Sequence, residues 1–178
     1  FVFNVYGDGD EYAPLQQIMQ SRVPAADVVF HGRVPHSSMR NIWLNHDIFL
    51  QVSDFEGTSV SMLEAMAHGV VPVVTAASSG IDGVITQENG FVVPVGDMSS
   101  MAAVIAQLAG DEASLAKVGH EAYRTAETYA MDLYAEKFAQ VLDEVVAAED
   151  VVDYRERYGM FSPPHPLVML RQKMEQQR

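Results

Sequence analysis

Residues 47–67 read DIFLQVSDFEGTSVSMLEAMA, a stretch that joins a strand pattern to a helix pattern. The apolar run over residues 47–52 predicts a buried strand, and the apolar stripe near the end of the stretch has helical spacing. Between them Glu56 and Gly57 open a short polar turn, and Glu64 follows on the predicted helix. Because the first N–H groups of a helix lack intrahelical partners and carry partial positive charge, this strand-turn-helix unit predicts an anion site suited to a phosphate or diphosphate.

The rest of the chain alternates apolar runs with helical patterns. Strands are predicted over residues 1–6, 28–31, 48–52, 70–74 and 90–93. Helices are predicted over residues 12–21, 37–45 and 60–68, from residue 97 onward, and over residues 111–129 and 132–148. Strands that are apolar throughout and are separated by helices indicate a parallel sheet covered on both faces. The predicted fold class is therefore α/β, a Rossmann-like parallel sheet with helices on both faces.

Polar residues and glycines predict where several helices begin and end. Ser37 and Asp97 are predicted N-caps, because a short side-chain oxygen can accept a hydrogen bond from the first turn. Gly69 is expected to end the helix that carries Glu64, since glycine tolerates the left-handed conformation. The predicted buried stripe of that helix consists of Leu63, Met66, Ala67 and Val70.

Composition excludes several classes of function. The chain of 178 residues has no cysteine, which excludes disulfides and thiolate chemistry. Its formal net charge of −13 argues against nucleic acid or an anionic membrane as a partner. No apolar run is long enough for a transmembrane segment. The histidines show no ligand spacing, so no metal site is predicted. Backbone amides, or basic residues outside this sequence, would have to offset the negative field around any bound phosphate.

The domain organisation is expected to be simple. The sequence opens at Phe1 within a strand-like run, without a methionine or a signal peptide, so we expect it to be a piece of a longer protein. Residues 1–149 are predicted to form one partial domain, and residues 150–178 a tail of unknown role. Residues 162–166 contain prolines that break any helix, and residues 167–177 could form a short last helix. The sequence does not indicate the oligomeric state.

Several motifs occur along the chain in the same order as in a known family. In sequence order these are Gly7-Asp8-Gly9, Val29-Phe30-His31-Gly32-Arg33-Val34, Asp47-Ile48-Phe49, Ser53-Asp54-Phe55-Glu56-Gly57, Leu63-Glu64-Ala65-Met66-Ala67-His68-Gly69-Val70-Val71-Pro72-Val73-Val74, Gly80-Ile81 and Asn89-Gly90-Phe91-Val92-Val93-Pro94. Over residues 1–128 the chain resembles the C-terminal, nucleotide-sugar-binding half of a retaining glycosyltransferase of the GT-B fold, family 4 type. In such a half, one further strand-helix unit would precede residue 1.

The resemblance implies a role for each part of the predicted site. Glu64 would accept hydrogen bonds from the ribose hydroxyls of a nucleoside-diphosphate sugar. Glu56 is the predicted catalytic residue, through contact with hydroxyls of the transferred sugar, and no nucleophile is assigned. The backbone amides expected to hold the sugar hydroxyls and the diphosphate belong to Gly57, Thr58, Ser59 and Val60. The residues expected to flank the base are Gly32, Arg33 and Val34.

The resemblance also implies a reaction and its partners. The donor substrate would be a nucleotide sugar, with no cofactor and no metal ion, and the anomeric configuration would be retained. The acceptor domain, and an arginine and a lysine that bind the diphosphate, would lie before residue 1, so this chain alone is expected to be inactive. The expected compartment is the cytoplasm, where the part outside this sequence could hold the protein at a membrane. The sequence does not identify the donor base, the sugar or the acceptor.

The sequence departs from the family pattern at one motif, lacks a dinucleotide fingerprint at another, and leaves two alternative functions open. Relatives often carry Gly-Gly-Ile-Pro-Glu where this chain has Ser79-Gly80-Ile81-Asp82-Gly83, which leaves the role of Asp82 undefined. The run Gly7-Asp8-Gly9-Asp10 is not a dinucleotide fingerprint, because Tyr12 stands where the third glycine belongs. The alternatives are a nucleotide-sugar 2-epimerase of the same architecture and a non-catalytic nucleotide-binding module.

Overall fold

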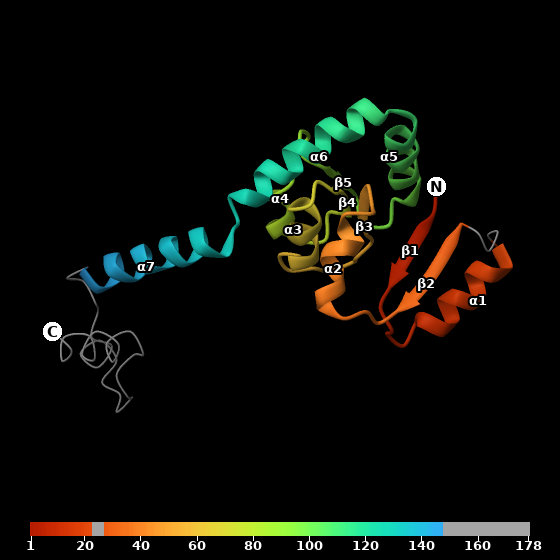
Figure 1. The fold of residues 1–178 in the computed structure, drawn as a ribbon, viewed down its shortest axis with the longest axis horizontal. Coiled ribbons are helices and arrows are strands. Elements are labelled where there is room, and N and C mark those ends of the chain that lie inside the picture. Colours follow the sequence, from red (N-terminus) through yellow and green to blue (C-terminus); the bar gives the residue numbers. More distant parts are fainter. Residues whose placement is uncertain (23–26, 148–178) are drawn as a thin grey trace. The chain divides into compact units, whose positions relative to one another are not determined.

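A computed structural model describes residues 1–22 and 27–147 of the chain, which divides into two units (Figure 1). The first unit comprises Phe1–Thr128, and the second begins at Tyr129. The predicted tail helix over residues 167–177, and the prolines before it, lie outside the described residues. The predicted domain boundary at residue 149 stays a prediction.

The strands of the first unit form two parallel sheets. The smaller sheet pairs β1 (Phe3–Tyr6) with β2 (Val28–Gly32). The larger sheet contains β3 (Ile48–Gln51), β4 (Val71–Thr75) and β5 (Phe91–Val93), with β4 in the centre. The parallel α/β architecture predicted from the sequence is therefore confirmed, although the strands belong to two sheets.

Helices connect these strands in the expected alternation. In the first unit they are α1 (Tyr12–Arg22), α2 (His36–Trp43), α3 (Val60–Met66), α4 (Ser79–Asp82), α5 (Met98–Gly110) and α6 (Glu112–Glu127). The second unit contains α7 (Met131–Ala147). The short helix α4 was not predicted from the sequence. Figure 1 shows helices lying beside both faces of the larger sheet.

The central strand β4 explains why the sheet has helices on both sides. All five of its residues are buried. Val71 and Val73 pack into a cluster with Met101 and Leu108 of α5. Val74 packs instead with residues of α3 and α6. A central parallel strand buries both of its faces, which is why the sequence of β4 is apolar throughout instead of alternating.

The helix ends agree with the sequence at two positions and differ at one. Asp97 caps α5 by accepting a hydrogen bond from the Ser100 N–H at 3.0 Å. Gly69 has a φ of +74° just beyond α3, the left-handed conformation expected of it. The prediction of Ser37 as an N-cap is wrong. The helix begins at His36, two residues earlier than a Ser37 cap implies, and Pro35 occupies the cap position with an extended backbone and no side-chain cap.

The buried face of α3 is rotated from the predicted stripe. Met66 and Val70 are buried as expected and Leu63 is partly buried, but Ala67 is exposed. Met62 and Ala65 are buried in its place. Met62 joins the cluster shared with α6, and Ala65 joins the cluster with Trp43 of α2. Packing against two helices sets this face, and the sequence period alone does not show which neighbours are present.

A cavity of about 820 Å³ separates the two sheets within the first unit. It is lined mainly by residues 1–8 and 45–50, which include β1 and β3, and we name it the β1–β3 cavity. In the described part of the chain, β1 pairs only with β2 and β3 pairs only with β4. The indole N–H of Trp43, which also lines the cavity, is buried without a hydrogen-bond partner. The strand edges that face this cavity therefore have no strand partner in the described part of the chain.

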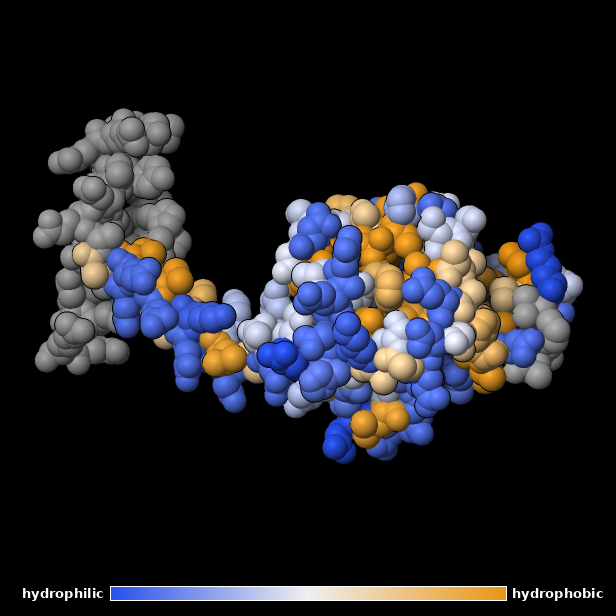
Figure 2. All heavy atoms as spheres, turned by 90° about the horizontal axis from the view of Figure 1, so that it is seen from above, coloured by the Kyte–Doolittle hydropathy of each residue, from blue (hydrophilic) through white to orange (hydrophobic). Residues whose placement is uncertain are grey.

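Exposed apolar side chains also mark the second unit. Tyr134, Phe138 and Val141 of α7 are more than half exposed, and Figure 2 shows hydrophobic atoms along this helix. Rings of Tyr134 and Phe138 stack with their centroids 6.0 Å apart. No helix of the described residues is both long and apolar enough to cross a bilayer.

Candidate functional site

The loop between β3 and α3 holds Glu56 in one orientation. Its carboxylate oxygen Oε2 accepts a hydrogen bond from Gln51 Nε2 at 2.6 Å and a longer one from Ser53 Oγ at 3.4 Å. The backbone N–H of Glu56 donates to the carbonyl of Ala77 at 3.3 Å. The side chain is therefore held by the end of β3, while its backbone is tied to the segment that follows β4.

Further hydrogen bonds clamp this loop to the end of β4. Thr75 Oγ1 donates to the Ser53 carbonyl at 2.5 Å and accepts from the Ser53 N–H at 3.0 Å. Ser78 Oγ donates to the Gly57 carbonyl at 2.9 Å. At Gly80 an added Cβ would lie 2.9 Å from Thr58 Oγ1, so a glycine allows α4 to approach the loop closely. The loops after β3 and β4 thus form one surface at the carboxyl edge of the larger sheet.

At the start of α3, one residue caps the helix and its neighbours are exposed. Ser59 is the N-cap, and its buried hydroxyl accepts a hydrogen bond from the Met62 N–H at 3.2 Å. The Ser59 side chain is thereby committed to the helix, which leaves the backbone groups of the turn as the ones that could meet a ligand. Gly57, Thr58 and Val60 are exposed beside it. The placement of these residues suits the predicted ligand contacts, which remain predictions.

Glu64 lies in the middle of α3 and has a partner that was not predicted. His36 Nε2 is 3.0 Å from Glu64 Oε1, and the two side chains are 85% and 32% exposed. His36 is the first residue of α2 and follows the loop after β2. This contact brings the predicted base-flanking loop and the predicted ribose-binding acid together. Because 28 residues separate the two positions, no local sequence signal could have found it.

The residues predicted to flank the base lie at the end of β2 and in the loop that follows it. Gly32 has a φ of +65°, and its carbonyl accepts a hydrogen bond from the Gly7 N–H at 2.9 Å. Arg33 and Val34 line the β1–β3 cavity. In the described part of the chain Arg33 makes no ion pair, so its guanidinium is available to an anion. Glu56 and Glu64 do not line this cavity.

Other candidate groups are not assembled into a site. Asp8 and Asp10 form an Asp-x-Asp sequence in the loop after β1, but no group of three or more potential metal ligands is found among residues 1–22 and 27–147. Asp82, at the end of α4, is exposed, and the structure does not test a role for it.

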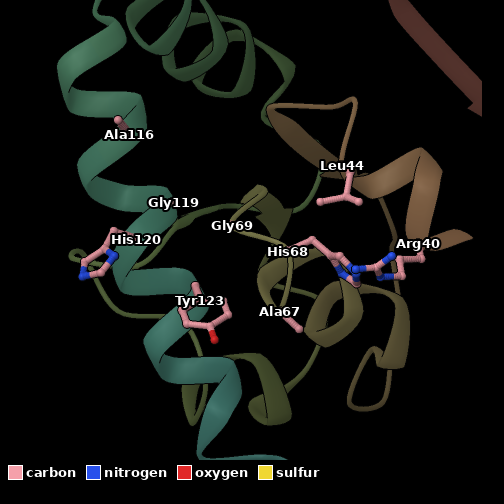
Figure 3. Close-up of a pocket in the computed structure, with 9 residues that line it drawn as sticks. All are labelled: Arg40, Leu44, Ala67, His68, Gly69, Ala116, Gly119, His120 and Tyr123. Atoms are coloured by element: carbon pink, nitrogen blue, oxygen red, sulfur yellow. The ribbon is translucent and has the colours of Figure 1, made fainter.

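A second, more open hollow contains none of the predicted donor-binding residues. Its volume is about 660 Å³, and α2, α6 and the turn after α3 surround it (Figure 3). Its lining includes Arg40, His68, Gly69, His120 and Tyr123. Hydrogen bonding to Glu127 raises the pKa of Tyr123 above its ordinary value. None of the residues predicted to bind a donor lines this hollow.

The fold and the two anchored carboxylates define an open α/β domain whose polar residues gather at the carboxyl ends of its strands, where ligands of such domains bind. A known family matches the same part of the chain. The profile of the family described as "Glycosyl transferases group 1" matches residues 1–125. The chain belongs to this family.

Three curated relatives are named as transferases. The chain is 29% identical over 148 residues to an exopolysaccharide phosphotransferase of Streptomyces coelicolor, covering 82% of this chain and 16% of that protein. It is 24% identical over 146 residues to a poly(glycerol-phosphate) alpha-glucosyltransferase of Bacillus subtilis, covering 80% and 21%. It is 29% identical over 153 residues to the amylovoran biosynthesis glycosyltransferase AmsK of Erwinia amylovora, covering 82% and 37%. The chain therefore spans well under half the length of these relatives.

Solved structures share the fold at lower identity. The sucrose-phosphate synthase of Thermosynechococcus elongatus aligns with a TM-score of 0.73 at 20% identity, over 82% of this chain and 39% of that one. HepE of Anabaena, solved in complex with UDP-glucose, aligns with a TM-score of 0.70 at 20% identity, over 80% and 41%. At this level of identity the likeness supports the fold and says nothing of this chain's own ligand.

Proposed function

We propose that this chain is the donor-binding half of a glycosyltransferase that transfers the sugar of a nucleoside-diphosphate sugar to an acceptor with retention of anomeric configuration. The carrying observation is the placement of Glu56 and Glu64 in the loop and helix that follow β3, where the start of α2 and the loop after β4 contact them. Open α/β sheets bind ligands at this edge. Membership of the glycosyl transferases group 1 supports the same reading.

In this proposal each carboxylate acts on a different part of the donor. Glu64 accepts hydrogen bonds from the ribose hydroxyls, which suits an acceptor-only group that is one-third exposed. Glu56 contacts hydroxyls of the transferred sugar, and its hydrogen bonds from Gln51 and Ser53 keep it in place. The residues from Gly32 to Val34 flank the base.

The chemical step breaks the bond between the anomeric carbon and the diphosphate oxygen and forms a bond from that carbon to a hydroxyl oxygen of the acceptor. The hydroxyl proton passes to the leaving diphosphate. Negative charge grows on the leaving diphosphate, so fixed donors beside it lower the barrier. Backbone amides of Gly57, Thr58, Ser59 and Val60 supply part of this stabilisation. The net charge of −13 means that further cations are needed, which basic residues of the longer protein would provide. No metal ion, cofactor or protein nucleophile is part of the proposal.

A donor screen on the full-length protein tests the proposal. Purified protein is incubated with a panel of nucleotide sugars and candidate acceptors, and products are followed by mass spectrometry and by NMR of the anomeric proton. We expect one class of donor to be consumed, the new linkage to keep the donor's anomeric configuration, and the Glu64→Ala variant to lose most of the turnover. An inverted product contradicts retention. Turnover that is unchanged in Glu64→Ala contradicts the assigned site.

The same screen separates the two alternatives. A nucleotide-sugar 2-epimerase would convert a donor to its epimer without any acceptor. A non-catalytic module would bind the nucleotide sugar and leave it intact. Either result replaces the transferase assignment while keeping the fold and the family.

A further inference from the structure

The contact between His36 and Glu64 joins two elements that the proposed nucleotide site must bring together. His36 opens α2 directly after the loop of residues 32–35, and Glu64 lies on α3. Nε2 of His36 is 3.0 Å from Oε1 of Glu64. Since a carboxylate can only accept, His36 Nε2 carries the hydrogen and donates it.

Only one of the two carboxylate oxygens of Glu64 accepts a hydrogen bond among the described residues. Oε1 accepts from His36, and no hydrogen bond to Oε2 is found among the described residues. The backbone of Glu64 is held as well, because its carbonyl accepts a hydrogen bond from His68 Nδ1 at 2.7 Å. Oε2 remains able to accept hydrogen bonds from a ligand.

We propose that His36 is a positioning residue for the nucleotide site, which holds the Glu64 carboxylate through Oε1 so that Oε2 can accept from the ribose hydroxyls. The inference rests on the proposed function. His36 acts through Glu64 and also ties the base-flanking loop to the ribose-binding helix. It need not touch the donor.

Because the pair is exposed, we expect it to affect ligand affinity more than folding stability. The His36 side chain is 85% exposed, and ion pairs or hydrogen bonds so open to water add little to folding stability. Glutamate, however, has several rotatable bonds, and fixing it costs conformational entropy. When His36 fixes it before the ligand arrives, that cost no longer reduces affinity. The structure therefore assigns His36 an effect on ligand affinity that exceeds its effect on stability.

Calorimetric titration of the full-length protein with UDP, GDP, ADP and dTDP provides the measurement, and the nucleotide that wild-type protein binds most tightly is used for the variants. We expect His36→Ala to weaken binding about three- to tenfold, in the range of a hydrogen bond to a charged group that is partly exposed. His36→Gln should restore binding to within about twofold, because its amide nitrogen stands the same number of bonds from Cα as Nε2. The melting temperature should be unchanged in both variants.

Two controls separate positioning from a general structural role. His120→Ala removes another exposed imidazole, at the hollow between α2 and α6, and should leave binding unchanged. In a Glu64→Ala background, His36→Ala should have no further effect on binding, since its partner is gone. Equal losses in both backgrounds, no loss from His36→Ala, or failure of His36→Gln to restore binding would each overturn the inference.

The outcome for Glu64 keeps this inference distinct from the proposed function. If wild-type protein binds none of the four nucleotides, or if Glu64→Ala binds as wild type does, the proposed function fails and the inference fails with it. If Glu64→Ala weakens binding but His36→Ala does not, only the role of His36 is wrong.

Discussion

At the scale of single residues, Glu56 and Glu64 differ in how they are held. Glu56 accepts hydrogen bonds from Gln51 and Ser53, both from its own strand and loop. Glu64 is held by His36, which belongs to another element. A group fixed by its own loop suits the reacting end of a donor, where small displacements cost much of the rate. A carboxylate such as that of Glu64, which is held by a residue of another helix, suits recognition of the nucleoside.

Substitution of the two acids by glutamine in the full-length enzyme should separate these roles. Glu64→Gln should mainly raise the donor KM, because ribose contacts act on ground state and transition state alike. Glu56→Gln should mainly lower kcat, because it touches the sugar being transferred. Each loss should be about 1 to 3 kcal/mol, the size of a hydrogen bond to a charged group left unmade. If steady-state kinetics show kcat and KM moving alike in both variants, the division of roles is wrong.

Asp97 predicts a pH dependence of stability. Hydrogen bonds from Ser100 hold the pKa of Asp97 below its ordinary value, so the folded state favours the charged carboxylate. This contribution is complete above the ordinary pKa of an aspartate, about 3.9, and is lost as the pH falls through the lowered pKa of the folded state. Asp97→Asn keeps a capping oxygen but cannot titrate.

The measurement is the melting temperature of wild type and Asp97→Asn from neutral pH down to pH about 2. Wild type should melt higher at neutral pH, and the difference should shrink below about pH 4. Other carboxylates titrate in both proteins and cancel in the difference. A difference that stays constant over this range would show that the charge of Asp97 adds nothing to the cap.

At the scale of elements, two glycines set how closely α6 packs on the turn after α3. A Cβ added at Gly119 would lie only 2.4 Å from the carbonyl oxygen of Gly69, a backbone atom that cannot rotate away. Gly119→Ala should therefore push α6 off the turn and destabilise the protein by about 1 to 3 kcal/mol, as overpacking does.

Gly110→Ala is the matched control, because Gly110 also lies in a helix but has nothing within 4 Å of an added Cβ. Alanine has the higher helix propensity, so this variant should be neutral or slightly stabilising. Urea unfolding of both variants gives the free energies of unfolding. Equal stability of Gly119→Ala and Gly110→Ala would contradict the close approach of α6.

The elements that the sequence predicted are those set by local chemistry. The strand and helix around Glu56 followed from an apolar run, a polar turn and helical spacing, and Asp97 and Gly69 were found from the preferences of helix ends. The features that were missed depend on distant partners. The rotated buried face of α3 requires α2 and α6, and the contact of His36 with Glu64 spans 28 residues.

At the scale of the whole molecule, this chain should bind a donor without transferring its sugar. It spans 16% to 37% of the relatives described above, and the acceptor site is proposed to lie in the remainder. We expect residues 1–178 alone to show no sugar transfer above a Glu64→Ala control, while weak nucleotide binding persists. Turnover of any nucleotide sugar by the isolated chain above the Glu64→Ala control would contradict this prediction.

The β1–β3 cavity predicts where a longer protein would add to this fold. Its two strand edges are unpaired in the described part of the chain, and the Trp43 N–H lacks an acceptor. Buried indole donors are normally hydrogen-bonded, and a further strand seated between β1 and β3 would pair both free edges in one continuous parallel sheet. Hydrogen exchange at β1 and β3 should then be slower in the full-length protein than in the isolated chain. Equal exchange rates would show that this cavity stays open.

A crystal structure of the full-length protein with the nucleoside diphosphate that it binds most tightly tests most directly whether Glu64 and its surroundings form the donor site. We expect the ribose hydroxyls within hydrogen-bond distance of Glu64, the base beside residues 32–34, and the diphosphate against the backbone of residues 57–60. A nucleotide bound elsewhere, such as in the hollow beside Arg40 and His120, with Glu64 still exposed to solvent, would contradict the proposed function.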